Sequence, residues 1–100
     1  MNNTDHKIRI LIADDHPIFR SGLGRLLESA PGFKVVGEAA DGNQAVALAQ
    51  RLKPDVLLLD VAMPGKPGLD ALRELSASGT TVCTILLTAN IERSQLLEAL

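Results

Sequence analysis

Apolar residues follow two patterns that alternate along the chain. Short runs of consecutive apolar residues are separated by segments in which apolar residues recur at the spacing of an amphipathic helix. The runs predict strands at 8–13, 33–40, 56–60 and 82–88. The other segments predict helices from Pro17 to Ala30, between Asp41 and Pro54, between Gly68 and Ser78, and from Ile91 to Leu100. This alternation is typical of an α/β fold.

Each of the first three helical segments carries one apolar stripe that we expect to face a sheet. The stripes consist of Phe19, Leu23, Leu26, Leu27 and Ala30, then Ala45, Val46, Leu48, Ala49 and Leu52, then Leu69, Leu72 and Leu75. Asp41 and Gln44 resemble a capping box, and Pro17 suits the first turn of a helix behind an acidic cap. Gly37 and Glu38 make the second strand a poor one, as an edge allows.

The third strand contains four consecutive apolar residues and ends at Asp60. A run without polar alternation predicts a strand that is covered on both faces. Parallel strands joined by right-handed crossovers give a doubly wound sheet with helices on both faces. Because the strand carboxyl ends then share one edge, Asp14, Asp15, Asp60 and Thr88 are expected to meet there.

Converging carboxylates repel one another unless a cation joins them. A set of oxygen ligands suits Mg²⁺, which keeps several waters and takes few protein ligands, so the sequence predicts a magnesium site. A carboxylate beside bound Mg²⁺ can attack a phosphoryl group and form an aspartyl phosphate. Asp60 is the candidate nucleophile, and the Thr88 hydroxyl can donate a hydrogen bond to a phosphoryl oxygen.

Composition narrows the class of protein. The 100 residues are 46% hydrophobic, which supports one domain with a modest core. A net charge of -2 without Trp or Tyr leaves neither a basic surface nor stacking platforms for nucleic acid. No apolar run approaches the roughly 18 residues that span a bilayer, and the polar start carries no export signal, so we expect a cytoplasmic protein and no membrane contact. Cys83 is predicted to be a small buried residue in a reducing cytosol.

Three motifs agree in order and spacing with one protein family. Asp14-Asp15 after the first strand, Asp-Val-Ala-Met-Pro-Gly at 60–65 and Leu-Thr-Ala at 87–89 resemble the receiver domain of two-component response regulators. The resemblance extends over residues 8–100 and implies a flavodoxin-like parallel sheet with the strand order 2-1-3-4-5.

Residues 14–23 and 36–42 resemble the NarL/FixJ-type branch, whose members are transcription regulators with a C-terminal LuxR-like helix-turn-helix. By this resemblance Asp60 accepts phosphate from a sensor histidine kinase, and Thr88 is the switch residue. The resemblance also implies that Mg²⁺ is bound by Asp15, Asp60 and the backbone carbonyl of Ala62, with Asp14 acting largely through water.

The chain also departs from the family pattern. Family members continue into a fifth strand, which ends in a lysine that pairs with the phosphoryl group, and a fifth helix, and this chain stops before both. Lys66 is not assumed to replace that lysine. We therefore expect residues 1–100 to be an incomplete receiver domain with the order 2-1-3-4, whose DNA contact depends on an absent C-terminal domain. The open edge of strand 82–88 predicts self-association through the fourth strand or the fourth helix.

Other interpretations stay open. In a purely structural one, Asp14 and Asp15 are helix caps and Asp60 is a turn residue. His16 is expected to be a turn or capping residue, because Mg²⁺ prefers oxygen ligands, and Met63 is expected to anchor the loop beneath the site.

Three alternative functions use the same sheet. A Mg²⁺-dependent phosphotransferase usually needs a second acid two residues after the nucleophile, where this chain has Ala62, so we do not expect an enzyme. A mononucleotide binder would need a phosphate-cradling loop where Asp14 and Asp15 stand. The third alternative is an inactive interaction or oligomerisation fragment of the same regulator.

Overall fold

The computed structural model describes residues 6–87. In chain order the elements are β1 (Ile8–Ala13), α1 (Pro17–Ser29), β2 (Phe33–Ala39), α2 (Gly42–Leu52), β3 (Val56–Asp60), α3 (Gly68–Ala77) and β4 (Cys83–Leu87). Every element predicted within this range is present, with ends close to the predicted ones. Thr88 and the predicted helix at 91–100 lie outside the described residues.

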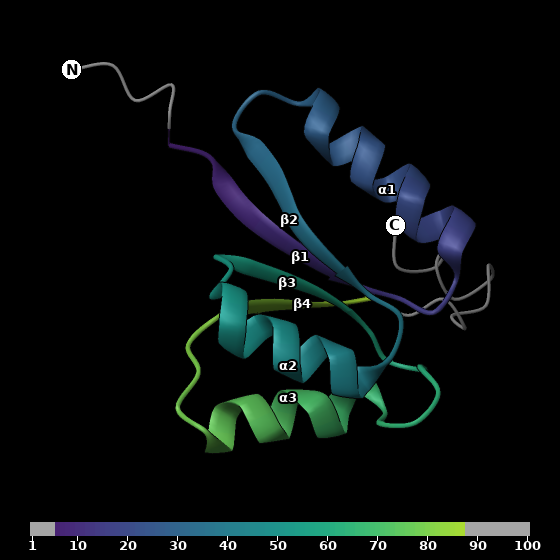
Figure 1. Cartoon of the computed structure of the whole chain (residues 1–100), viewed down its shortest axis with the longest axis vertical. Helices are drawn as coiled ribbons and strands as arrows, with labels where there is room; N and C mark the ends of the chain where they lie inside the picture. Colours follow the sequence, from purple (N-terminus) through teal and green to yellow (C-terminus); the bar gives the residue numbers. More distant parts are fainter. Residues whose placement is uncertain (1–5, 88–100) are drawn as a thin grey trace, which may run out of the picture.

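The strands lie side by side in the order β2-β1-β3-β4, and every neighbouring pair is parallel. Helix α1 covers one face of this sheet, while α2 and α3 cover the other (Figure 1). The predicted doubly wound, flavodoxin-like α/β fold with the order 2-1-3-4 is thereby confirmed. As its poor strand pattern indicated, β2 lies at an edge of the sheet.

Alternate side chains of the two central strands enter two different cores. Ile10 and Ile12 of β1 and Leu58 of β3 pack with Leu23 and Leu27 of α1. The strand residues between them pack against α2 and α3 in a second cluster, which includes Leu11, Ala13, Leu57, Leu59, Ala45, Val46, Ala49, Ala71 and Leu75. Burial on both faces explains why these strands are continuous apolar runs.

The two predicted helix starts differ in outcome. Asp41 caps α2 by accepting from the Gln44 amide at 2.8 Å, and the Gln44 side chain accepts from the Ala40 amide at 2.9 Å, so the capping box is confirmed with a shift of one residue. Helix α1 begins at a proline as predicted, but its cap residue is His16, which makes no side-chain cap bond. The acidic cap was wrong, because Asp14 instead accepts from the His16 amide at 2.7 Å.

The predicted stripe of α1 was partly wrong. Leu23 and Leu27 pack against the sheet, but Phe19 is 51% exposed and Leu26 is 67% exposed. The buried Gly24 lies on the inward face with Leu23 and Leu27, and this orientation turns the other two side chains to the flank.

The predicted stripe of α3 is correct at two of its three positions, because Leu75 is buried and Leu72 packs against the core. Leu69, predicted to point inward, is 45% exposed, whereas Gly68, Ala71 and Leu75 are buried. Because Gly68 lies against the backbone at Asp60, the inward face of α3 includes Gly68, Ala71 and Leu75.

Cys83 is exposed at the start of β4, which contradicts the prediction of a buried thiol. An apolar run indicates a strand but does not say which of its positions another element covers. In the described part of the chain, β4 is an edge strand, and its burial pattern mixes exposed with partly buried positions.

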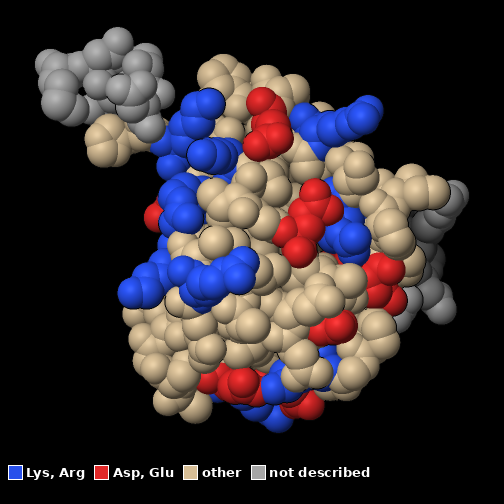
Figure 2. All heavy atoms as spheres, in the orientation of Figure 1, with Lys and Arg blue, Asp and Glu red and all other residues tan. Residues whose placement is uncertain are grey.

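The surface carries charges of both signs. Figure 2 shows Lys and Arg side chains mainly towards the left of the view, with Asp and Glu spread over the centre and right. No helix within residues 6–87 is long and apolar enough to cross a membrane.

We predict that Leu57→Ala lowers the free energy of unfolding by about 2–5 kcal/mol, because Leu57 is fully buried and a cavity would remain. Leu26→Ala makes the same chemical change at an exposed position of α1 and should cost less than about 0.5 kcal/mol. Urea denaturation measures both values. Equal losses in the two variants would contradict the two-sided core.

Candidate functional site

Two neighbouring strands bring their terminal carboxylates to one place. Asp14 directly follows β1, and Asp60 is the last residue of β3. These strands pair in parallel with Ala13 opposite Leu59, so both carboxylates lie at the same edge of the sheet. Each of the two residues is only 1% exposed. The structure thus brings Asp14 and Asp60 together as predicted and shows that both carboxylates are buried, whereas Thr88, predicted at the same edge, lies outside the described residues.

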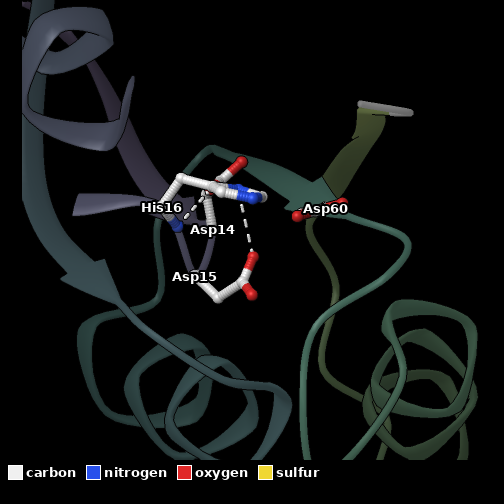
Figure 3. Close-up of side chains that lie close together, drawn as sticks. All are labelled: Asp14, Asp15, His16 and Asp60. Carbon is white, nitrogen blue, oxygen red and sulfur yellow. Dashed lines mark hydrogen bonds and ion pairs between the residues drawn. The ribbon is translucent and has the colours of Figure 1, made fainter. Parts of the chain in front are cut away.

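Asp15 and His16 complete the group (Figure 3). Asp14, Asp15, His16 and Asp60 can each offer one ligand atom, and these atoms lie within 4.8 Å of one another. The His16 Nδ1 atom lies 2.9 Å from Asp14 Oδ1 and 3.1 Å from Asp15 Oδ1. His16 stands at the cap position of α1 without making a side-chain cap bond, and its imidazole contacts the carboxylates of Asp14 and Asp15.

Two buried carboxylate oxygens make no hydrogen bond within the described residues: Asp60 Oδ2 and Asp15 Oδ1, of which only the second has an ion-pair contact, with His16 Nδ1. The other oxygen of Asp60, Oδ1, accepts from the Ala62 amide at 3.0 Å. Buried polar atoms normally have partners, so these two oxygens need an explanation. Unpaired carboxylate oxygens that face one another are the donors that a hard divalent cation takes.

The surroundings raise the pKa of both Asp60 and His16, which disfavours the charged form of the acid and favours the charged form of the imidazole. Burial raises the pKa of Asp60 above 3.8, the Ala62 amide opposes this shift, and the charges of Asp14 and Asp15 add to it. The hydrogen bond with Asp14, followed by the charge of Asp15, raises the pKa of His16 above 6.5. The pocket therefore disfavours its own negative charge and favours a protonated imidazole beside it.

The loop after β3 supports the pocket. Met63 is 5% exposed and belongs to the core on the α2 and α3 side, which confirms its predicted role as an anchor. Lys66 forms an ion pair with Glu74 of α3 and donates to no carboxylate of the pocket.

Sequence reasoning missed Arg20. Its guanidinium donates to the backbone carbonyl of Asp14 and, at 2.9 Å, to Glu38 of β2. One side chain thereby ties the acidic loop to α1 and to the edge strand. A signal was available, because Arg20 lies three and seven residues before Leu23 and Leu27, and a charge on an inward stripe needs a partner.

We predict that Asp60→Asn stabilises the metal-free protein at neutral pH. A raised pKa in the folded state means that the folded protein holds this proton more tightly than the unfolded chain, so stability falls as pH rises from 3.8 through the folded-state pKa. Asparagine keeps an acceptor for the Ala62 amide without the charge. The gain should be on the order of 1–2 kcal/mol at neutral pH and should disappear as pH falls below 3.8.

Urea denaturation over a pH series measures this gain. Asp70→Asn, which removes an exposed acid from α3, serves as the control and should show no comparable gain. An Asp60→Asn protein that is less stable than the unsubstituted protein at neutral pH would show that the buried charge is not unfavourable.

Comparison with known proteins agrees with this geometry. The family model of the response regulator receiver domain matches residues 10–100. The nitrate/nitrite response regulator protein NarP of Escherichia coli is 49% identical over 82 residues, which are 82% of this chain and 38% of NarP. The chain thus spans about two fifths of this relative's length.

Solved structures show the same architecture. The signal receiver domain of the response regulator NarL from Mycobacterium tuberculosis superposes with a TM-score of 0.82 at 36% identity, covering 94% of this chain and 76% of that one. RcsB from Salmonella enterica serovar Typhimurium, bound to promoter rprA in the presence of the phosphomimetic BeF3⁻, superposes with a TM-score of 0.77 at 31% identity, covering 85% of this chain and 44% of RcsB. The chain therefore belongs to the receiver domain family of two-component response regulators, with NarL-type transcriptional regulators among its relatives.

Proposed function

We propose that this chain is the phosphoacceptor domain of a transcriptional response regulator and that Asp60 accepts a phosphoryl group from a sensor histidine kinase. The observation that carries the proposal is the buried Asp60 carboxylate, which ends a central strand beside two further carboxylates and keeps one oxygen without a partner in the described structure. A strand-end nucleophile in this position can be reached by a donor group.

The donor set fits Mg²⁺. Asp15, Asp60 and the Ala62 carbonyl would hold the ion, and Asp14 would act largely through water. The buried Oδ2 atom of Asp60, which has no hydrogen-bond partner in the described structure, supports this assignment. When bound, Mg²⁺ neutralises charge on the transferring phosphoryl oxygens.

Ala62 and Asp60 have separate roles in the proposed phosphoryl transfer. The Ala62 amide holds Asp60 Oδ1 and so fixes the plane of the carboxylate. An oxygen of Asp60 forms the bond to phosphorus while the phosphorus–nitrogen bond of a phosphohistidine donor breaks and the donor imidazole leaves.

We also propose Thr88 as the switch residue. Asp60 pairs with Leu87 across β3 and β4, and the Leu87 carbonyl accepts from the Val61 amide at 3.0 Å, so the chain leaves β4 beside the candidate phosphorylation site. Thr88 follows in sequence, outside the described residues. Its hydroxyl would gain a charged acceptor only after phosphorylation.

The wider setting is proposed from the family. The partner is a sensor histidine kinase in the cytoplasm, and contact with DNA belongs to a separate C-terminal domain of the regulator. RcsB, of which this chain covers 44%, is bound to promoter DNA in its solved structure, which supports DNA contact for a relative. Self-association through the fourth strand or fourth helix stays a prediction, consistent with Ile85 at 49% and Leu86 at 40% exposure. With Ala62 at the second position after Asp60, we propose no enzymatic turnover of an outside substrate.

We predict that incubation with a small phosphodonor, such as acetyl phosphate, and Mg²⁺ adds one acid-labile phosphoryl group to the chain. Asp60→Asn should abolish the addition, because Asp60 keeps a buried oxygen without a hydrogen-bond partner in the described structure, whereas Asp14 Oδ1 is paired with His16. Intact-mass spectrometry measures the product.

Two further samples sharpen this test. Asp70→Asn should label like the unsubstituted protein. Asp15→Asn should lose most of the labelling, and the labelling that remains should no longer depend on Mg²⁺. Label that persists in Asp60→Asn, or that forms equally well after removal of Mg²⁺ with a chelator, would refute the proposed function.

A further inference from the structure

The segment between Asp60 and α3 controls the geometry of the candidate site. Residues 61–67 form this loop, which includes the Ala62 amide that holds Asp60 and the Ala62 carbonyl proposed as a cation ligand. In Figure 1 the loop leaves the end of β3 and passes beside the start of α2 before it enters α3. Two glycines, one in each helix, meet the backbone at the two ends of this loop.

Gly68, the first residue of α3, meets the end of β3. A Cβ atom at this position would lie 2.9 Å from the Val61 Cα and 3.1 Å from the Asp60 carbonyl carbon, and closer still to the Asp60 carbonyl oxygen. The Gly68 amide also donates to the Val61 carbonyl at 3.0 Å. The start of α3 therefore touches the backbone of the candidate phosphoacceptor, with no room for a side chain.

Gly42, the first residue of α2, meets the other end of the loop. A Cβ atom there would lie 2.7 Å from the Lys66 Cβ and 2.8 Å from the Lys66 carbonyl carbon, and closer still to the carbonyl oxygen. The obstacle is mainly backbone, so rotation of a side chain cannot relieve it. Because Asp41 caps this end of α2, the helix start is fixed and can act as a support for the loop.

We infer that Gly42 and Gly68 are positioning residues of the candidate site, whose close backbone contacts set loop 61–67 so that the Ala62 amide reaches Asp60 and its carbonyl faces the cation. The inference rests on the proposed function for its cation-binding part. A methyl group at either glycine forces the loop or the helix start to move, and Ala62 lies between the two contacts.

The chain offers two matched controls with the same Gly→Ala change. At Gly37 in β2 a Cβ atom would lie 2.9 Å from Leu52 Cδ1 and 3.3 Å from Leu11 Cδ1, so Gly37→Ala crowds the core without touching the loop. At Gly22 in α1 no heavy atom lies within 4 Å of the added Cβ in the described structure. Gly37→Ala therefore shows the effect of crowding in the core away from the loop. Gly22→Ala shows the effect of an added methyl group that meets no other atom.

Each variant is tested for Mg²⁺ affinity by isothermal titration calorimetry, for hydrogen exchange at the Ala62 amide in the metal-free protein by NMR, and for stability by urea denaturation. Gly42→Ala and Gly68→Ala should weaken Mg²⁺ binding by roughly 10- to 100-fold, as displaced supporting contacts do at metal sites. Both should also speed exchange of the Ala62 amide. Gly37→Ala should leave the Mg²⁺ affinity and the Ala62 exchange rate unchanged whatever it does to stability, and Gly22→Ala should leave both unchanged while gaining stability, because alanine is favoured over glycine inside a helix.

A second pair of variants keeps the test decisive if the glycine variants do not fold. Asp41→Ala removes the cap that fixes the start of α2, and Asp41→Asn keeps a capping acceptor while removing the charge. Asp41→Ala should speed exchange at Ala62 and weaken Mg²⁺ binding several-fold, and Asp41→Asn should do neither.

The possible failures are distinguishable. An unsubstituted protein without measurable Mg²⁺ affinity would refute the proposed function, and the Ala62 exchange rates would still test the glycines. Folded Gly42→Ala and Gly68→Ala proteins with unchanged exchange and affinity would overturn the inference. The same holds if Gly37→Ala weakens Mg²⁺ binding as much as they do, or if Asp41→Ala leaves Ala62 unaffected.

Discussion

The structure depends on placing carboxyl groups where water scarcely reaches them. Asp14 and Asp60 are each 1% exposed, and they stand at the ends of two central strands whose buried residues are otherwise apolar on both faces. A buried charge without a partner is strongly unfavourable. The rest of the site consists of groups that reduce this cost, and none of them removes it completely within the described residues.

These groups come from separate elements. The Ala62 amide serves Asp60, His16 leans over Asp14 and Asp15, and Arg20 binds the carbonyl of Asp14 instead of its carboxylate. Arg20 holds the acidic loop in place but leaves the carboxylate oxygens free for another partner. This arrangement fixes the position of the acids while leaving part of their charge uncompensated, as a cation-binding pocket requires.

The sequence predicted features that follow from chain periodicity. Apolar runs located β1 and β3, and because parallel strands share one carboxyl edge, the convergence of Asp14, Asp15 and Asp60 followed before any contact was known. Prediction from the sequence failed where packing depends on how a helix is rotated about its axis. Phe19 and Leu26 fit the apolar spacing of α1, and Leu69 fits that of α3, yet all three are exposed. The inward faces of these helices are set by close contacts at small residues.

Sequence patterns could not predict the close backbone contacts, for a related reason. A glycine at a helix start is ordinary in sequence, and only the position of a distant segment shows that a methyl group at Gly42 would meet Lys66. The exposed Cys83 gives the converse example, because its apolar neighbours said nothing about which element would cover it.

The unfavourable charge also links stability to binding. A pocket whose acids were fully compensated by protein donors would make the metal-free fold more stable, but a cation would then have to displace those donors. In this pocket Asp60 Oδ2 lacks such a donor in the described structure, so a bound cation would relieve repulsion without breaking a hydrogen bond to that oxygen. Ligands that bind only the folded state stabilise it. The same repulsion that weakens the empty fold should therefore strengthen cation binding, which is why substitutions that neutralise the pocket are expected to gain stability and lose function together.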